Sequence, residues 1–271
     1  MPFPVEIAGA RGRNIRFDAP PRRIVSLVPS QTELLAHLGL HEATVGLTRF
    51  CVRPEGWKDE KEIVGGTKNV RVEKVEALRP DLVLANREEN TRDVVEAIDA
   101  FAPVFVTDVK SVPDAAAMIR AVGRLTGRPG EADALADRLD RRFDALTGDL
   151  TGATPIPVAY LIWQGPYMTV GGDTIIQDVM RRAGLENVFA ARTRYPEVTP
   201  AEIAAAGARA VLLPDEPFPF DADAAAELRD TLPDSVPTRL VNGQLFSWYG
   251  PRLAEAPPYL RRLRDSLPDA S

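Results

Sequence analysis

The same order of strands, loops and helices runs through the first half of this 271-residue chain and begins again in the second half. In the first half, short apolar runs rich in β-branched residues predict strands, and segments with helical periodicity lie between them. The predicted strands are 23–28, 45–47, 82–85 and 104–106, and the predicted helices are 32–38, 73–78 and 91–101. Strands that alternate with helices indicate a parallel, doubly wound sheet.

The pattern restarts after a break rich in Thr, Gly and Pro at 147–157. Strands are expected at 158–162, 210–213 and 239–241, and helices at 174–183 and from Thr199 onward. Before the break, two helices are expected at 113–125 and 131–146, the second with an apolar stripe of Leu135, Leu139, Phe143 and Leu146. We therefore predict an α/β fold of two doubly wound lobes with parallel sheets, joined by one long backbone helix, with a ligand cleft between the lobes. The predicted boundaries are 1–112 for the N-terminal lobe, 113–150 for the bridging helices and 151–271 for the C-terminal lobe.

Composition excludes several classes of function. The chain is 45% apolar and carries a net charge of −6, without the basic cluster that nucleic-acid binding requires. It has a single cysteine, so no disulfide forms within the chain. No segment is long and apolar enough to insert into a membrane, and we expect a monomer. The first residues lack a basic region followed by an apolar run, which predicts a cytoplasmic protein, or an extracytoplasmic one if a leader was removed.

Few residues have the pattern that catalysis needs. His37 and His41 are four positions apart, as metal ligands on a helix are, but Gly39 between them is expected to end that helix. No histidine lies near Cys51 in the sequence to activate its thiol. Phosphate-binding and nucleophile-elbow motifs are absent. We therefore expect no catalytic residue, no metal ligand and no required cofactor.

Aromatic residues in predicted loops give a stronger indication. Only 7% of the chain is aromatic, yet several of these residues follow predicted strands. A flat ligand face is a suitable partner for an aromatic ring in a loop. The alternative is that the rings pack against the lobe edges. The aromatic candidates for ligand binding are Phe50, Trp163, Tyr167, Tyr195, Trp248 and Tyr249.

Polar residues accompany these rings. Ser30 and Gln31 are expected at a helix N-terminus, where free N–H groups favour anions or amides, although Ser30 and Glu33 also have the spacing of a capping box. The turns Gly65–Asn69 and Gly171–Asp173 allow close approach of the backbone to a ligand. The remaining candidates for ligand binding are Cys51, Lys68, Asn69, Asn86 and Arg252.

The ordered set of short motifs resembles a known family. It comprises IVSLVPSQTELL at 24–35, VGG at 64–66, VEKV at 72–75, LRPDLVLA at 78–85, GGDT at 171–174, GLENVF at 184–189 and YPEVT at 195–199. From residue 24 to the C-terminus, this set resembles the class III substrate-binding proteins, the helical-backbone receptors of ABC importers for vitamin B12, haem and ferric siderophores. Within that family, the vitamin B12 receptors are the most similar.

The resemblance implies roles for particular residues. Phe50, Tyr167 and Tyr195 stand where the B12 receptors have a tyrosine, a phenylalanine and a tryptophan that contact the corrin. This chain departs from those receptors at other positions: Thr67 and Asn86 stand where the receptors have tryptophans, and Gln244 stands where they have an aspartate. The family also implies docking to a permease through one acidic residue per lobe. Glu73 matches the first, whereas the second position is Ala201, and the neighbouring Glu202 is also explained by a capping box with Thr199.

The leading hypothesis is a protein that binds a metal complex or a corrinoid, such as cobalamin, haem or a ferric siderophore. It would act in an ABC-type uptake system or as a leaderless, cytoplasmic relative, which the segments 50–51, 65–69 and 246–250 mark. One alternative is a chelatase-like enzyme of tetrapyrrole metal handling, which would need a metal-binding His or acidic pair. Another alternative is a cytoplasmic sensor or chaperone for the same class of ligand.

Overall fold

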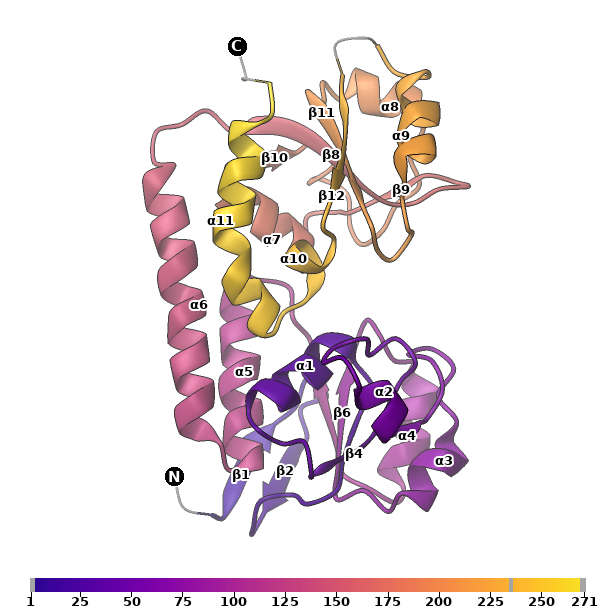
Figure 1. The fold of residues 1–271 in the computed structure, drawn as a ribbon, viewed down its shortest axis with the longest axis vertical. Coiled ribbons are helices and arrows are strands. Elements are labelled where there is room, and N and C mark those ends of the chain that lie inside the picture. Colours follow the sequence, from indigo (N-terminus) through magenta and orange to yellow (C-terminus); the bar gives the residue numbers. More distant parts are fainter. Residues whose placement is uncertain (1–2, 234–235, 269–271) are drawn as a thin grey trace. The chain divides into compact units, whose positions relative to one another are not determined.

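The computed structural model describes residues 3–233 and 236–268 of the chain (Figure 1). The chain forms two compact units. Residues up to Val109, with Pro113–Arg138 and Tyr249–Pro251, form the first unit. Lys110–Val112, Leu139–Trp248 and the residues from Arg252 onward form the second.

A five-stranded parallel sheet is the centre of the first unit, with strand order β5-β4-β3-β6-β7. An antiparallel hairpin of β1 and β2 precedes it. The elements of this unit are β1 (Val5–Ala8), β2 (Asn14–Phe17), β3 (Ile24–Ser26), α1 (Pro29–His37), β4 (Thr44–Leu47), α2 (Trp57–Glu60), β5 (Glu62–Ile63), α3 (Val72–Ala77), β6 (Leu82–Asn86), α4 (Arg92–Asp99), β7 (Val104–Thr107) and α5 (Val112–Thr126).

The central strands of this sheet are buried on both faces, which explains their near-continuous apolar sequence. Alternate residues of β3 and β6, such as Val25 and Val83, form one core cluster. Val75 of α3 and Val95 and Ile98 of α4 pack into the same cluster. Thr91 caps α4 by accepting a hydrogen bond from the backbone N–H of Val94. The helices therefore hold the carboxyl ends of β3, β4 and β6 at one edge of the sheet.

A second sheet of five strands is the centre of the second unit, with order β10-β8-β11-β12 and β9 paired to β8. Its parallel pairs are β10 with β8, β8 with β11, and β11 with β12, whereas β9 is antiparallel. The elements of this unit are β8 (Ile156–Trp163), β9 (Met168–Thr169), α7 (Ile175–Arg182), β10 (Leu185–Asn187), α8 (Pro200–Ala205), β11 (Ala210–Pro214), α9 (Ala222–Arg229), β12 (Thr238–Val241), α10 (Gln244–Ser247) and α11 (Pro251–Asp265).

The core of the second unit is built like that of the first, from apolar residues of adjacent parallel strands and of a helix packed against them. Ala159 and Leu161 of β8 form a cluster with Val211 and Leu213 of β11, and Ile203 of α8 packs against it. Thr199 caps α8 through a capping box with Glu202, in which each side chain binds the other's backbone N–H. This is the capping box that the sequence predicts at that position.

Helix α6 (Pro129–Asp149) has 21 residues, and the division between the two units falls within it, after Arg138. Leu135, Leu139, Phe143 and Leu146 of its predicted apolar stripe are all buried. Two separate sheets, parallel except for β9, and one long amphipathic helix confirm the predicted α/β fold class. No helix in the described part of the chain is long and apolar enough to cross a membrane.

Several element boundaries differ from the prediction. Pro29 was expected to end the first strand, but it is the first residue of α1. Asn86 and Trp163 were expected in loops and are instead the last residues of β6 and β8. The hairpin of β1 and β2 was not predicted, because its strands have only four residues each and polar residues interrupt their apolar positions.

Candidate functional site

The start of α1 does not have the predicted cap. The N-cap residue is Val28, without a side-chain hydrogen bond, and Pro29 is at the first helical turn. Ser30 is therefore inside the helix rather than at its cap, so its predicted capping box with Glu33 is wrong. Ser30 and Gln31 are buried, and Gln31 Nε2 donates to Thr107 Oγ1 over 2.7 Å. Within the described residues, Ser30 Oγ and Gln31 Oε1 have no hydrogen-bond partner.

Cys51 is buried, with no exposed surface. Its Sγ lies 3.0 Å from Thr32 Oγ1 and 3.2 Å from Thr48 Oγ1. Burial raises the pKa of the thiol above its ordinary value. The side chain fills the space between α1 and the loop after β4, where it acts as a small apolar group. Its contact with a ligand stays a prediction.

Phe50, next to Cys51, has the opposite environment. Its ring is 48% exposed, and the Arg49 guanidinium carbon lies 4.9 Å from the ring centroid. The Gly65–Asn69 turn lies beside it, because a Cβ at Gly66 would come within 3.1 Å of the Phe50 ring. Gly65 has a φ of +116° and a Cβ there would collide with the Asn69 carbonyl, so this turn requires glycine. The turn therefore leaves Phe50 exposed at the carboxyl end of β4.

Asn86 is a structural residue of the first unit. Its Nδ2 donates to Thr107 Oγ1 over 3.2 Å, and its Oδ1 accepts from the Glu88 backbone N–H over 2.8 Å. Asn86 is only 2% exposed. Its amide therefore ties β6 to β7, although it also lies on the wall of a cavity described below. Lys68, which is exposed like Asn69, donates through Nζ to the Glu88 carbonyl.

The aromatic residues of β8 and its hairpin lie at the surface of the second unit. Trp163 ends β8, is 43% exposed and contacts Phe218 edge-on, with ring centroids 5.4 Å apart. Tyr167, in the turn before β9, is half-buried against the core, and burial raises its pKa. Phe218 in turn packs against Phe220, with centroids 4.7 Å apart. Trp163 is thus partly exposed and is held by this edge-on contact.

The Gly171–Gly172 turn holds the segment that carries Tyr195. The N–H groups of Gly171 and Gly172 donate to the carbonyls of Arg194 and Arg192 over 2.7 and 2.8 Å. A Cβ at either glycine would come within 2.4 Å of a backbone oxygen of that segment. The glycines therefore allow two chain segments to approach each other, which differs from the predicted approach to a ligand. Tyr195, half-buried, is positioned by this pairing.

Trp248 and Tyr249 were expected to face a ligand from a loop, but each is only 6% exposed. Trp248 Nε1 donates to Glu216 Oε1, and Gln244 Nε2 donates to Glu216 Oε2 over 3.2 Å. The Arg252 guanidinium carbon lies 5.6 Å from the Trp248 ring centroid. Trp248 is therefore a core residue of the second unit, with a polar partner for its indole N–H.

Glu216 was not singled out by the sequence. It follows β11, and burial raises the pKa of its carboxyl group above the ordinary value, an effect that the donors Gln244 and Trp248 oppose. Tyr160 of β8 is fully buried beside it, and burial raises its pKa well above the ordinary value. Within the described residues, Tyr160 Oη has no hydrogen-bond partner. The only sequence signal for this cluster was the acidic pair Asp215 and Glu216 at the end of a predicted strand.

The two acidic residues considered for partner docking differ. Glu73 is exposed in the first turn of α3. Glu202 is engaged: it belongs to the capping box of α8, and its Oε1 accepts from Arg192 over 2.7 Å. The Arg192 hydrogen bond and the cap together lower the pKa of Glu202. Its structural role is therefore the one that the sequence spacing indicated.

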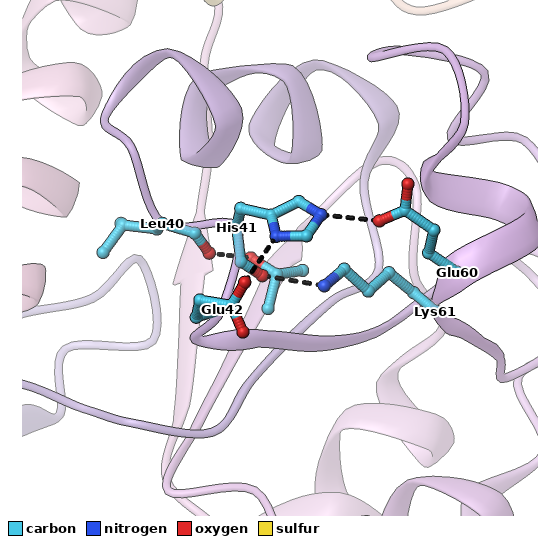
Figure 2. A network of polar contacts seen from close by, with 6 residues as sticks. Leu40, His41, Glu42, Glu60 and Lys61 are labelled. Carbon is cyan, nitrogen blue, oxygen red and sulfur yellow. Dashed lines mark hydrogen bonds and ion pairs between the residues drawn. The ribbon is translucent and has the colours of Figure 1, made fainter.

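His41 is held among charged groups in the first unit, as Figure 2 shows. Its Nε2 lies 2.6 Å from Glu60 Oε2, and its Nδ1 lies 3.1 Å from Glu42 Oε1. Lys61 Nζ donates to the His41 carbonyl over 2.9 Å. The Glu60 hydrogen bond, followed by that of Glu42, raises the pKa of the imidazole. Among the described residues, no group of three or more His, Cys, Asp and Glu side chains is arranged to hold a metal ion.

Known proteins resemble this chain over most of its length. The vitamin B12-binding protein of Pectobacterium carotovorum is 27% identical over 237 residues, which cover 86% of this chain and 84% of that protein. The periplasmic vitamin B12-binding protein of Vibrio cholerae has a similar fold, with a TM-score of 0.77 at 21% identity over 90% of this chain and 96% of that one. A periplasmic haem-binding protein of Pseudomonas aeruginosa gives a TM-score of 0.75 at 24% identity over 93% of this chain and 95% of that one.

The family relationship rests on sequence as well as fold. The family model described as "Periplasmic binding protein" matches residues 24–230, which is more than half of the chain and includes elements of both units. This match begins at β3, where the resemblance of the sequence motifs also begins. The chain therefore belongs to the periplasmic binding protein family.

Proposed function

We propose that the protein binds a metal complex or a corrinoid or tetrapyrrole-like small molecule, with cobalamin, haem and ferric siderophores as the candidate ligands. It would do so as the substrate-binding component of an ABC-type uptake system or as a cytoplasmic relative of such a component. The observation that carries the proposal is the family match over residues 24–230, together with a relative, at 27% identity, that is named a vitamin B12-binding protein.

Exposed aromatic rings support this class of ligand. Phe50 and Trp163 are among the few large apolar side chains that the described structure leaves exposed, at 48% and 43%. Phe50 follows β4 and Trp163 ends β8, and ligands of open α/β sheets bind beyond the carboxyl ends of the strands. Each ring makes a contact that helps to fix it: the Arg49 guanidinium lies over the Phe50 ring, and Phe218 packs edge-on against Trp163. A ring fixed in this way offers a flat apolar face at low entropic cost.

Two buried polar groups add to the support. Ser30 Oγ and Gln31 Oε1 are buried without a protein partner in the described structure, and buried polar atoms are nearly always hydrogen-bonded. A ligand group or an ordered water would satisfy them. Lys68 and Asn69, exposed in the turn beside Phe50, are the proposed polar contacts of the first unit. Tyr167 and Tyr195, both half-buried, are those of the second unit.

The experiment is a titration of the purified protein with cyanocobalamin, cobinamide, haemin and a ferric hydroxamate, followed by absorbance and by tryptophan fluorescence. We expect saturable binding of one of these ligands. The variants Phe50→Ala and Trp163→Ala should each weaken it at least about tenfold, because a buried ligand-facing aromatic contributes on the order of 2 kcal/mol.

The control is an exposed apolar residue away from the carboxyl ends of the strands. Phe101 is 37% exposed in the segment between α4 and β7. Phe101→Ala should leave the affinity unchanged. No binding of any of the four probes, or equal losses in the control and the test variants, would refute the proposed ligand class or the proposed residues, respectively.

A permease is the partner that the proposed uptake role implies. The exposed Glu73 is the proposed docking acid of the first unit, whereas Glu202 is engaged by Thr199 and Arg192. Glu73→Lys should therefore weaken capture of a candidate permease without changing ligand affinity. Unchanged capture would remove Glu73 from the proposal.

A further inference from the structure

A cavity in the first unit lies beside the β1–β2 hairpin and is unrelated to the aromatic residues above. Its volume is about 690 Å³, within the range of small-molecule sites. The turn of the hairpin, the end of β6, β7 and helix α4 form its walls. The hairpin is held over this region, because the Ala10 N–H donates to the Val106 carbonyl over 2.7 Å.

Arginine dominates the polar lining of this cavity. Arg11, Arg13, Arg87 and Arg92 face two carboxylates, those of Glu96 and Asp99. The lining therefore carries a net positive charge, although the whole chain has a net charge of −6. A concentration of guanidinium groups in an acidic protein is the pattern that recognises oxyanions, because the planar fork binds carboxylate or phosphate oxygens in pairs.

The pairing of these arginines leaves positive charge in excess. Arg11 and Arg13 share one carboxylate: Arg11 lies 2.9 Å from Asp99 Oδ1, and Arg13 lies 2.5 Å from Asp99 Oδ2. Two guanidinium groups on one carboxylate leave one charge uncompensated. Arg11 and Asp99 are also partly buried, with side chains 25% and 20% exposed, which strengthens their electrostatic interactions relative to those in water.

The other end of the cavity is less constrained. Arg92 pairs with Glu96 one helical turn later over 2.6 Å, and its side chain is 86% exposed. Arg87 pairs with Asp108 over 3.3 Å, and its side chain is 62% exposed. Both side chains can therefore turn toward a ligand at little cost, since exposed ion pairs contribute little to stability.

Anchoring of the hairpin accounts for only part of this arrangement. The Arg11 and Arg13 pairs with Asp99 join the hairpin to α4. They do not account for Arg87 and Arg92 on the same cavity, nor for its volume. The walls also include apolar side chains, among them Val95 and Val106, which suit an organic group.

We propose that this cavity is a second binding site, for a small organic anion whose phosphate or carboxylate group is held by Arg11 and Arg92. Its lining includes none of the residues proposed above to bind the metal complex, and Asn86 alone among the candidates from the sequence. The two proposals therefore succeed or fail independently.

The test uses the full ¹⁵N-labelled chain, titrated with adenosine 5′-monophosphate and with citrate, and with neutral adenosine as the uncharged comparison. We expect saturable shift changes at the amides of residues 10–13 and 86–96, with a Kd of about 1 mM or tighter for at least one anion. Binding should weaken as salt is raised. The two anions distinguish a phosphate site from a carboxylate site, and either result supports the proposal.

Arg11→Gln and Arg92→Gln should each weaken the anion affinity by about tenfold. Arg92→Gln removes a largely exposed side chain and should leave the fold unchanged, which keeps the test valid if Arg11→Gln loosens the hairpin. The matched control is Arg16→Gln, in the same hairpin, where the side chain is 62% exposed, pairs with Asp18 and does not line the cavity. No saturable shift with either anion, equal binding of adenosine, or equal losses in the control would overturn the proposal.

Discussion

Replacing Trp248 by alanine should lower the stability of the second unit, rather than remove a contact with a ligand. The side chain is 6% exposed, and its indole N–H donates to the partly buried Glu216 carboxyl group. Removal of a buried tryptophan leaves a cavity and costs about 3–5 kcal/mol. Glu216 keeps Gln244 as a donor, but it loses the hydrogen bond from the indole.

Trp163→Ala is the comparison within the same unit. Its ring is 43% exposed and makes one edge-on contact with Phe218, so we expect a loss of only about 1 kcal/mol. Trp248→Phe separates the two parts of the effect at the core position. It keeps most of the apolar volume and removes the N–H donor, so its loss should be about 1–3 kcal/mol.

The assay is unfolding by heat and by urea, followed by circular dichroism. At about 2–4 °C per kcal/mol for a chain of this size, Trp248→Ala should lower the Tm by about 10 °C and Trp163→Ala by about 3 °C. Ligand affinity, measured on the folded fraction, should fall with Trp163→Ala. A Trp248→Ala protein that melts with the wild type and loses ligand affinity instead would refute the assignment of Trp248 to the core.

Two further predictions concern the first unit. The Cys51 thiol is buried and its pKa is raised, so it should react with an aromatic disulfide reagent at least about tenfold more slowly in the native protein than in urea. The reaction rate is followed by absorbance, and equal rates in the two conditions would contradict the burial of the thiol. The raised pKa of His41 means that the folded state binds the proton more tightly, so its contribution to stability is full below pH ~6.5 and is lost as the pH rises through the folded-state pKa. The Tm difference between wild type and His41→Gln should therefore be larger at low pH than at high pH, and a pH-independent difference across this range would show that Glu60 and Glu42 do not hold the proton.

Local sequence predicted the elements of this fold well where short-range physics decides them. The apolar runs around Val83 and Val211 are strands of parallel sheets, as their near-continuous hydrophobicity indicated. The capping box of Thr199 and Glu202 forms as its spacing predicts, since both partners lie within one helical turn. The same reasoning was wrong for Ser30, because Pro29 can occupy the first turn of α1, so the N-cap is Val28 instead of Ser30.

The candidate site was less predictable, because exposure depends on contacts between distant segments. The alternation of strands and helices in the sequence determined an α/β protein with two parallel sheets, since that pattern depends on local periodicity. Phe50 and Cys51 are neighbours in the chain, yet one ring is half-exposed and the other side chain is fully buried, a difference set by Thr32 and the turn at Gly66. Trp248 is buried, and its indole N–H finds its acceptor in Glu216, 32 residues earlier. Only the tertiary structure decides such pairings, because they depend on which segments the two sheets bring together.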